Sequence, residues 1–328
     1  MPLPLPPATV GALCALGASA AFSLNDLAIK ALSGGYPLHQ ITLIRAVLAL
    51  IITLGVVMPL SGGWGQMRTR RPGLHLIRST FIVASNLFFY AAVAAIPLAD
   101  ATAIFFVSPL LLAIFAMVFL GERVGPWRWG AIAAGLAGVA LIIRPGSEAF
   151  VPVALLPLAA AACYAASSTM TRRLGLRESA PTLAFYIQIT FLAFSTAVGL
   201  TLGDGCLHDA DGGAALAFLT RAWIAPPPAD WPLLGLAGLG SALGGLLISQ
   251  AYRLCEAALV APFEYAALPM AILWGFAVFG DWPDGPAWVG ISLILAAGLT
   301  MVWRETRRTS PGPIPPSELP IAKPPKQV

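Results

Sequence analysis

Long apolar runs alternate with short polar breaks along this 328-residue chain. A helix that crosses the hydrocarbon core of a bilayer needs about 20 mostly apolar residues. The pattern therefore predicts an all-α integral membrane protein with ten transmembrane helices. The predicted helices cover residues 9–32, 38–60, 74–96, 98–120, 126–143, 151–171, 182–202, 231–252, 257–280 and 286–303.

Most connections between the predicted helices are very short, so neighbouring helices are expected to form antiparallel hairpins. The one long connection covers residues 203–230 and is acidic. Residues 1–8 form a short cytoplasmic N-terminus that lacks the positive region of a cleavable signal peptide. Residues 305–328 form a polar, proline-rich cytoplasmic tail, which cannot bury a core and is expected to be disordered.

Lysine and arginine gather on the cytoplasmic side of membrane proteins, so their placement predicts orientation. With both termini in the cytoplasm, fourteen basic residues lie in inner segments. Only Lys30, Arg144 and Arg221 lie outside, while Arg45 and Arg78 fall within spans. The chain is therefore expected to be a multi-pass protein of a bacterial-type inner membrane with both termini cytoplasmic.

The composition also favours a lipid environment, because 58% of the residues are hydrophobic and 10% are charged. Soluble domains carry about 25% charged residues. The net charge of +4 is modest, and the basic residues are not interleaved with aromatic ones. Nucleic acid is therefore not an expected partner. The four cysteines show no CxxC spacing, so neither a disulfide framework nor a metal site is expected.

The two halves of the chain resemble each other. Residues 91–144 can be laid without gaps on residues 251–304, at an offset of 160, and Pro109 then meets Pro269. Interrupted helices at corresponding positions of two repeats mark the solute site of many secondary carriers. Pro109 and Pro269 are therefore expected to line a site. The alternative is that each proline only kinks its helix for packing.

An odd number of helices per half inverts the second half relative to the first. Five predicted helices in each half therefore predict two inverted five-helix repeats, over residues 9–146 and 147–304. The long connection lies within the second repeat.

Several motifs carry a family resemblance. The sequence IPLADATAI at 96–104 is followed by Ser108-Pro109, by LGER at 120–123 and by Arg144-Pro145-Gly146. This pattern resembles the EamA family of the drug/metabolite transporter superfamily, over about residues 9–304. The second copy diverges, since Asp281-Trp282-Pro283 stands where the first has Gly121-Glu122-Arg123.

The resemblance implies a secondary transporter without a cofactor, which moves a small organic metabolite through a central cavity by alternating access. It leaves the substrate and the direction open. Family members are similar to importers of riboflavin or S-adenosylmethionine and to exporters of amino acids or drugs. Residues 22–30 resemble the importers somewhat more. The expected partners are thus a small solute and the bilayer.

A membrane-embedded enzyme and a channel are the alternatives from other classes. The sequence contains no HExxH, GxSxG or P-loop motif, and no ring-forming filter motif. No catalytic residue is therefore expected, and a carrier is favoured.

Ionisable groups inside spans are costly and usually functional. Asp26 and Arg45 lie at similar depth near the outer ends of their spans and are expected to pair. Glu264 and Arg78 lie near the inner ends and are expected to form a second pair. The alternative is that these are packing ion pairs that touch no solute. The candidate pathway residues are Asn25, Asp26, Arg45, Arg78, Asn86, Tyr90, Pro109, Tyr164, Glu264, Tyr265 and Pro269.

Overall fold

The computed structural model describes residues 6–61, 63–67, 69, 71–121, 125–174, 180–208, 212–255 and 257–309. Within these residues, ten helices are long and apolar enough to cross a membrane, which confirms the predicted all-α architecture. The protein is therefore a multi-pass membrane protein.

The α-helices are α1 (Pro7–Leu32), α2 (Leu38–Ile52), α3 (Met58–Ser61), α4 (Pro72–Val93), α5 (Leu98–Phe105), α6 (Ser108–Leu120), α7 (Pro126–Ile143), α8 (Leu156–Leu174), α9 (Ala180–Leu202), α10 (Gly213–Thr220), α11 (Trp231–Leu254), α12 (Ala257–Glu264), α13 (Ala267–Trp274) and α14 (Gly285–Thr309). Two π-helical turns, η1 (Thr53–Val57) and η6 (Gly275–Phe279), continue α2 and α13. Short 3-10 helices form η2 (Trp64–Met67), η3 (Pro152–Leu155) and η5 (Pro228–Asp230).

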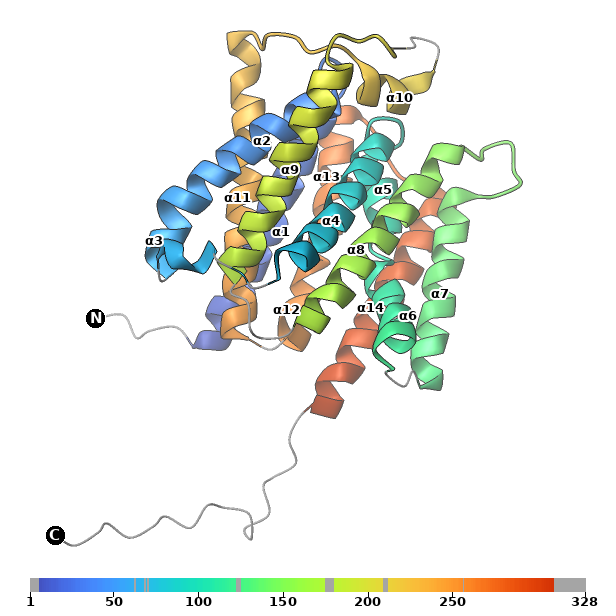
Figure 1. Cartoon of the computed structure of the whole chain (residues 1–328). Coiled ribbons are helices and arrows are strands. Elements are labelled where there is room, and N and C mark those ends of the chain that lie inside the picture. Colours follow the sequence, from blue (N-terminus) through green and yellow to red (C-terminus); the bar gives the residue numbers. More distant parts are fainter. Residues whose placement is uncertain are drawn as a thin grey trace, which may run out of the picture.

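The helices form one bundle, in which the first turn of α1 and the last turn of α14 lie at the same end (Figure 1). We call this end, which also holds the first turn of α7, the Arg128 end. The opposite end, at the top of Figure 1, carries α10 and is called the Tyr36 end. Its connections are residues 33–37, 94–97, 144–151, 203–227 and 280–284.

Proline and glycine define many helix boundaries. Proline occupies the first turn of α1, α4, α6, α7 and α11, where its missing N–H costs no helical hydrogen bond. Gly121 after α6 and Gly280 after η6 have φ angles of 72° and 71°. Glycine adopts this left-handed conformation without steric cost, and it ends both helices in the same way.

Two segments differ from the sequence expectation. The connection over residues 203–230 contains a short helix, α10, whose Phe218 is fully buried. Helix α10 has too few apolar residues to span a membrane, and the sequence pattern therefore predicted a loop here. Helix α14 continues to Thr309, past the expected boundary at 304. Residues 1–5 and 310–328, which include most of the predicted terminal segments, lie outside the described residues.

The fourth and ninth spans are both interrupted near their middle. Residues 106–107 separate α5 from α6, and residues 265–266 separate α12 from α13. Pro109 and Pro269 lie directly after these breaks. A proline cannot donate to the carbonyl four residues earlier, so it favours a break at this point. The expected interruption at corresponding positions is therefore confirmed.

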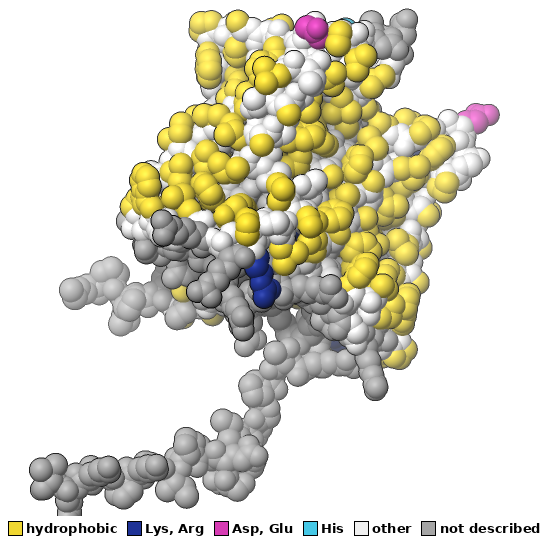
Figure 2. All heavy atoms as spheres, in the orientation of Figure 1, with side chains coloured by type: hydrophobic (Ala, Val, Ile, Leu, Met, Phe, Trp, Pro, Cys, Tyr) yellow, Lys and Arg dark blue, Asp and Glu magenta, His cyan; other side chains and the backbone are white. Residues whose placement is uncertain are grey.

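Lateral packing joins the N-terminal and C-terminal parts of the chain. Helix α1 packs on α11, α4 on α8, α2 on α9, and α7 on α14. Figure 2 shows the face of the bundle in this view covered mainly by hydrophobic side chains. Acidic side chains appear on it near the Tyr36 end, and basic ones near the Arg128 end. This distribution suits a surface that contacts lipid along its middle.

Helices α7 and α14 approach each other most closely at two glycines. A Cβ atom added at Gly138 would lie 2.7 Å from the carbonyl oxygen of Gly290, and one added at Gly290 would lie 2.6 Å from that of Gly138. Small residues allow this backbone contact, which is a common way of packing helices in membranes. Both glycines lie in the half of the bundle nearer to the Tyr36 end.

The glycine contact predicts a position-specific loss of stability. Gly138→Val should lower the free energy of unfolding by about 1–3 kcal/mol, because the added side chain overpacks the α7–α14 contact. The matched control is Gly130→Val on the same helix, since a Cβ atom at Gly130 meets nothing within 4 Å. Thermal unfolding in detergent measures both variants. Equal unfolding temperatures for the two would contradict the predicted contact.

Candidate functional site

A hydrogen-bonded polar network joins α1 to α4 inside the bundle. The Tyr90 hydroxyl donates to Asp26 Oδ1 at 2.8 Å, and the Asn25 amide donates to the same oxygen at 3.0 Å. Asn25 Nδ2 also donates to the Tyr90 oxygen at 2.8 Å. Asn25 and Tyr90 are buried. The network supplies donors to a carboxylate inside the protein, where an unpaired charge would be costly.

Arg45 of α2 joins the same network on the other side of Tyr90. Its guanidinium donates to Asn86 Oδ1 at 3.1 Å and to the Tyr90 hydroxyl at 3.4 Å. It also lies over the ring of Phe191 on α9, 4.9 Å from the centroid. The structure thus places Arg45 and Asp26 in one network, but instead of the predicted direct pair each contacts the hydroxyl of Tyr90, which lies between them.

Several buried polar atoms have no hydrogen-bond partner among the described residues. Besides Arg78 Nε and Asp100 Oδ1, they include Asn25 Oδ1, Thr102 Oγ1, Tyr265 Oη and Trp274 Nε1. Proteins leave few buried polar groups unpaired, so each such group requires an explanation. Together they offer both donors and acceptors in the interior, which suits a solute that forms neutral hydrogen bonds.

The predicted pair of Arg78 and Glu264 does not form. Arg78 donates to the carbonyl oxygen of Leu183 on α9 at 2.9 Å, and its contacts within the described residues do not include Glu264. Helix α4, which carries Arg78, packs on α8 and α9, whereas α12, which carries Glu264, packs on α1 and α14. Similar depth in the membrane therefore did not bring these two residues together.

Aromatic rings extend from the polar network toward the interrupted helices. The ring centroids of Tyr90 and Phe89 are 5.3 Å apart, as are those of Phe89 and Phe105. Phe105 in turn lies 5.5 Å from Tyr164 on α8. Tyr164 exposes 42% of its surface. An aromatic wall with a few polar groups is typical of a small-molecule site.

The two helix interruptions meet each other through their aromatic rings. Phe106, in the first interruption, stacks on Tyr265, in the second, with centroids 4.9 Å apart and planes at 29°. Gly298 of α14 makes room for Tyr265, since a Cβ atom there would lie 1.9 Å from the tyrosine hydroxyl. The interruptions that precede Pro109 and Pro269 therefore contact each other inside the bundle, where α5 also packs on α13.

At the Tyr36 end, two ion pairs join N-terminal to C-terminal parts of the chain. Lys30 Nζ of α1 lies 3.0 Å from Asp281 Oδ2 in the connection between η6 and α14. Arg144, after α7, pairs with Asp284. This hydrogen bond, together with one from the Ala287 N–H, holds the pKa of Asp284 below its usual range. The charges therefore remain paired at neutral pH.

Hydrogen bonds add further ties at the same end. The Tyr36 hydroxyl donates to Asp230 Oδ2 at 2.5 Å. Burial, followed by this hydrogen bond, raises the pKa of Tyr36 to about 12, so the hydroxyl keeps its proton. The Gln40 amide donates to the carbonyl of Ile224 at 2.6 Å and accepts from its N–H at 3.2 Å. Several hydrogen bonds across the bundle thus join helices and connections at the Tyr36 end.

Sequence reasoning missed several residues of this arrangement. Phe89, Phe106 and Phe191 were not singled out, because phenylalanine in an apolar helix more often faces lipid or core. The position of Phe89 beside Tyr90 was the only available signal. The pairing of Lys30 with Asp281 was also missed, since residues so far apart in the chain carry no local mark of contact.

Comparison with known proteins places this arrangement among transporters. The profile of the EamA-like transporter family matches residues 9–144. The chain is 33% identical to a protein of Rhizobium johnstonii named Riboflavin transporter, over 92% of this chain and 93% of that one. It is 24% identical to a protein of Rickettsia bellii named S-adenosylmethionine uptake transporter, over 88% and 91% of the two chains. One solved structure, titled only "Crystal structure of protein", matches 92% of this chain and 99% of that one with a TM-score of 0.62 at 20% identity, which supports the fold.

Ten spans, two interrupted helices that meet inside the bundle, and relatives named for small metabolites together define a multi-pass transporter of small metabolites. The resemblance found in the sequence motifs is correct as well. The chain belongs to the EamA-like transporter family, and its relatives named above are drug/metabolite-type transporters.

The polar network predicts a large effect of Asp26 on transport. Asp26→Asn should lower solute uptake about 10- to 100-fold, because hydrogen bonds to a charged group contribute about 1.5–3 kcal/mol. The control is Asp204→Asn, which removes an exposed carboxylate in the connection after α9. Uptake into proteoliposomes is measured at equal amounts of folded protein. Normal uptake by the Asp26 variant would show that this network is not part of the solute pathway.

Proposed function

We propose that this protein imports riboflavin across a bacterial-type inner membrane as a secondary transporter that works by alternating access. The observation that carries the proposal is the 33% identity, over 92% of the chain, to a protein named Riboflavin transporter. At this coverage the two chains share nearly every membrane-spanning segment, including the helices that bear the polar network and the two interruptions.

The chemistry of the interior supports a flavin as the solute. Riboflavin carries a flat three-ring system, which suits the aromatic series from Phe89 through Phe105 to Tyr164. Its ring edge and ribityl chain bear both donors and acceptors, which suit the unpaired polar groups of the interior. Riboflavin is neutral, and the charges of Asp26 and Arg45 in the network balance each other.

S-adenosylmethionine is the rival solute, because a relative at 24% identity is named for its uptake. That molecule carries a net positive charge at neutral pH. The Asp26 network holds a guanidinium close to its carboxylate, and this guanidinium repels a second cation. The network therefore favours the neutral flavin. The alternative function, export of amino acids or drugs, is tested by the same transport assay.

The proposed mechanism rests on two inverted five-helix halves, residues 9–146 and 147–304. Lateral contacts support this division, since corresponding helices make corresponding pairs: α1 packs on α11 as α8 packs on α4. Pro109 and Pro269 also correspond at the offset of 160, and the interruptions before them, residues 106–107 and 265–266, agree with this offset to within one residue. The excess of basic residues at the Arg128 end supports a cytoplasmic location of this end and of both termini.

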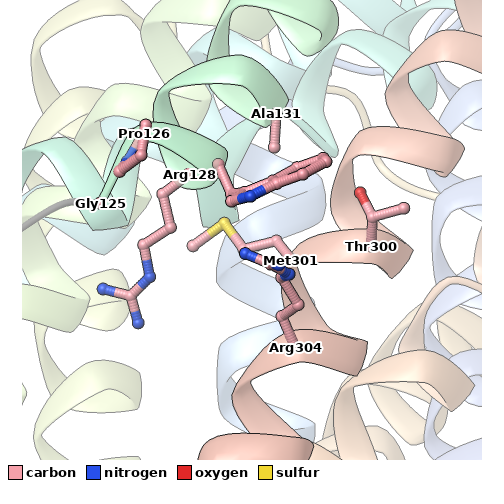
Figure 3. A pocket seen from close by; sticks show the side chains of 8 residues that line it. Gly125, Pro126, Arg128, Ala131, Thr300, Met301 and Arg304 are labelled. Atoms are coloured by element: carbon pink, nitrogen blue, oxygen red, sulfur yellow. The ribbon is translucent and has the colours of Figure 1, made fainter.

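Ion pairs tie helices together at the Tyr36 end, namely Lys30 with Asp281 and Arg144 with Asp284. Cavities lie at both ends of the bundle: one of about 60 Å³ between α7 and α14 at the Arg128 end (Figure 3), and one of about 170 Å³ beside Asp100 and Arg144 at the Tyr36 end. We infer that the two ion pairs must break for the outer end to open.

Direct transport tests the substrate. Proteoliposomes that contain the purified protein should take up labelled riboflavin, and riboflavin at a hundred times its dissociation constant should stabilise the detergent-solubilised protein by about 2.7 kcal/mol. An excess of S-adenosylmethionine should not compete. The Asp26→Asn variant is the matched control for the uptake signal.

Three results separate the alternatives. Uptake of S-adenosylmethionine but not of riboflavin would show that S-adenosylmethionine is the solute. Efflux of riboflavin without uptake would show that the protein is an exporter. Stabilisation by neither compound, together with uptake of neither, would contradict the proposed function.

The ion pair between Lys30 and Asp281 predicts a charge-swap rescue. Lys30→Asp and Asp281→Lys, each alone, place like charges together and should change riboflavin uptake about two- to five-fold, on the scale of about 1 kcal/mol for a partly exposed pair. The double variant K30D/D281K restores the attraction and should recover uptake. Riboflavin uptake rates measure all three variants.

A double variant no better than the two single variants would show that the side chains act independently. Single variants with normal uptake would show that the ion pair does not limit opening.

A further inference from the structure

The cavity of about 170 Å³ at the Tyr36 end lies beside the start of α5 and the end of α7. Its walls are mainly apolar, with Ile104, Ile143 and Val151 among them, and its charged lining residues are Asp100 and Arg144. Asp100 is not part of the polar network around Tyr90. A carboxylate in a mainly apolar cavity is costly, so its presence there calls for a partner.

The cavity brings together an unpaired acceptor and an unpaired donor. Asp100 Oδ1 is buried and has no hydrogen-bond partner among the described residues. The same holds for Nε of Arg144, although Nη2 of this residue pairs with Asp284. Water can fill a polar cavity of this size, but it supplies no charge to balance a carboxylate. A guanidinium would bind Asp100 more strongly, through charge-assisted hydrogen bonds.

Arg144, rather than Lys30, is the cation that can change its partner. Lys30 Nζ lies 3.0 Å from Asp281 and also donates to the carbonyl of Ile96 at 3.1 Å. Arg144 pairs with Asp284, whose side chain is 52% exposed, so water can readily replace this bond. The cavity beside Arg144 leaves its side chain room to rotate toward Asp100.

The backbone at Arg144 adopts an uncommon conformation. Its φ angle of 52° lies in the left-handed region, and no other non-glycine residue in the described part of the chain has a positive φ. The Cβ atom makes this conformation unfavourable. Such strain is often found at functional positions. Here the strained residue ends α7 and lies between the cavity and Asp284.

We propose that Arg144 exchanges ion-pair partners during transport: it pairs with Asp284 in the present conformation and with Asp100 when the outer end opens. Arg144 and Asp100 belong to the first of the two proposed halves, whereas Asp284 belongs to the second. The exchange thus replaces an ion pair between the halves with one inside a half. Asp100 is a positioning residue that acts through Arg144, and this role rests on the alternating access proposed above.

Opening of the outer end can be measured without any solute. Ala154 lines the same cavity and is 8% exposed, so a cysteine at this position should react with a maleimide mainly when the outer end opens. The reporter A154C is placed in the full-length chain with its four native cysteines replaced by serine. The labelling rate with a membrane-impermeant maleimide is measured in proteoliposomes.

The two carboxylates should affect this rate in opposite directions. D284N removes the partner of the present conformation and should speed labelling about two- to five-fold, the scale expected for a partly exposed ion pair. D100N removes the partner of the open conformation and should slow labelling by about the same factor. D100E keeps a carboxylate and should recover most of the wild-type rate.

A double-mutant comparison separates partner exchange from a local structural effect. If Asp100 acts through Arg144, D100N should have no effect in an R144Q background. The matched control is E148Q, which removes an exposed carboxylate from the connection after Arg144 and should leave the rate unchanged. Thermal unfolding checks each variant, and D100S or R144M replaces one that unfolds below the wild-type temperature.

Three results would overturn the proposal: an unchanged labelling rate in D100N, an equal effect of D100N with and without Arg144, or an unchanged rate in D284N. The second result would assign Asp100 a local structural role. Labelling needs no riboflavin, so failure of the partner exchange leaves the riboflavin proposal standing. Failure of riboflavin uptake likewise leaves the labelling result valid.

Discussion

The lipid interior offers no hydrogen-bond partners, so each polar group at membrane depth must be satisfied within the protein itself. Unbroken helices meet this requirement for the backbone, and they make up most of this structure. The two interruptions in the fourth and ninth spans free backbone groups from helical bonding. They are placed where Phe106 and Tyr265 stack on each other inside the bundle, away from lipid. The same requirement draws Asp26, Asn25 and Tyr90 into one network, because a carboxylate at this depth needs several donors.

A transporter must hold its helices together and still let two ends open in turn. In this structure the two demands are met by different kinds of contact. Apolar packing and close glycine contacts, such as that of Gly138 with Gly290, hold neighbouring helices. The ties across the Tyr36 end are ion pairs and hydrogen bonds, such as Lys30 with Asp281 and Tyr36 with Asp230. Such bonds can be exchanged for bonds to water at little net cost, because both partners lie near the aqueous surface.

Charge and aromatic rings are distributed differently along the membrane normal. The interior combines one balanced pair of charges, Asp26 and Arg45, with a series of aromatic rings, which suits a neutral and flat solute. At the Arg128 end, Arg128 and Arg304 lie beside the exposed Trp127, which suits the headgroup region of a membrane.

The sequence by itself determined the ten spans, their approximate limits and the family, because the length of an apolar run and the motifs around Pro109 are local properties. It also located the helix interruptions, since a proline in the interior of an apolar run removes a backbone hydrogen bond and favours a break. The partners of the buried polar residues were decided only by the tertiary structure. Asp26 and Arg45 both hydrogen-bond to the Tyr90 hydroxyl, whereas Arg78 hydrogen-bonds to a carbonyl of α9 and does not pair with Glu264. The physical reason is that residue depth follows from sequence position, but the rotation and lateral neighbours of each helix follow from packing, and apolar helices with similar faces leave many packings open.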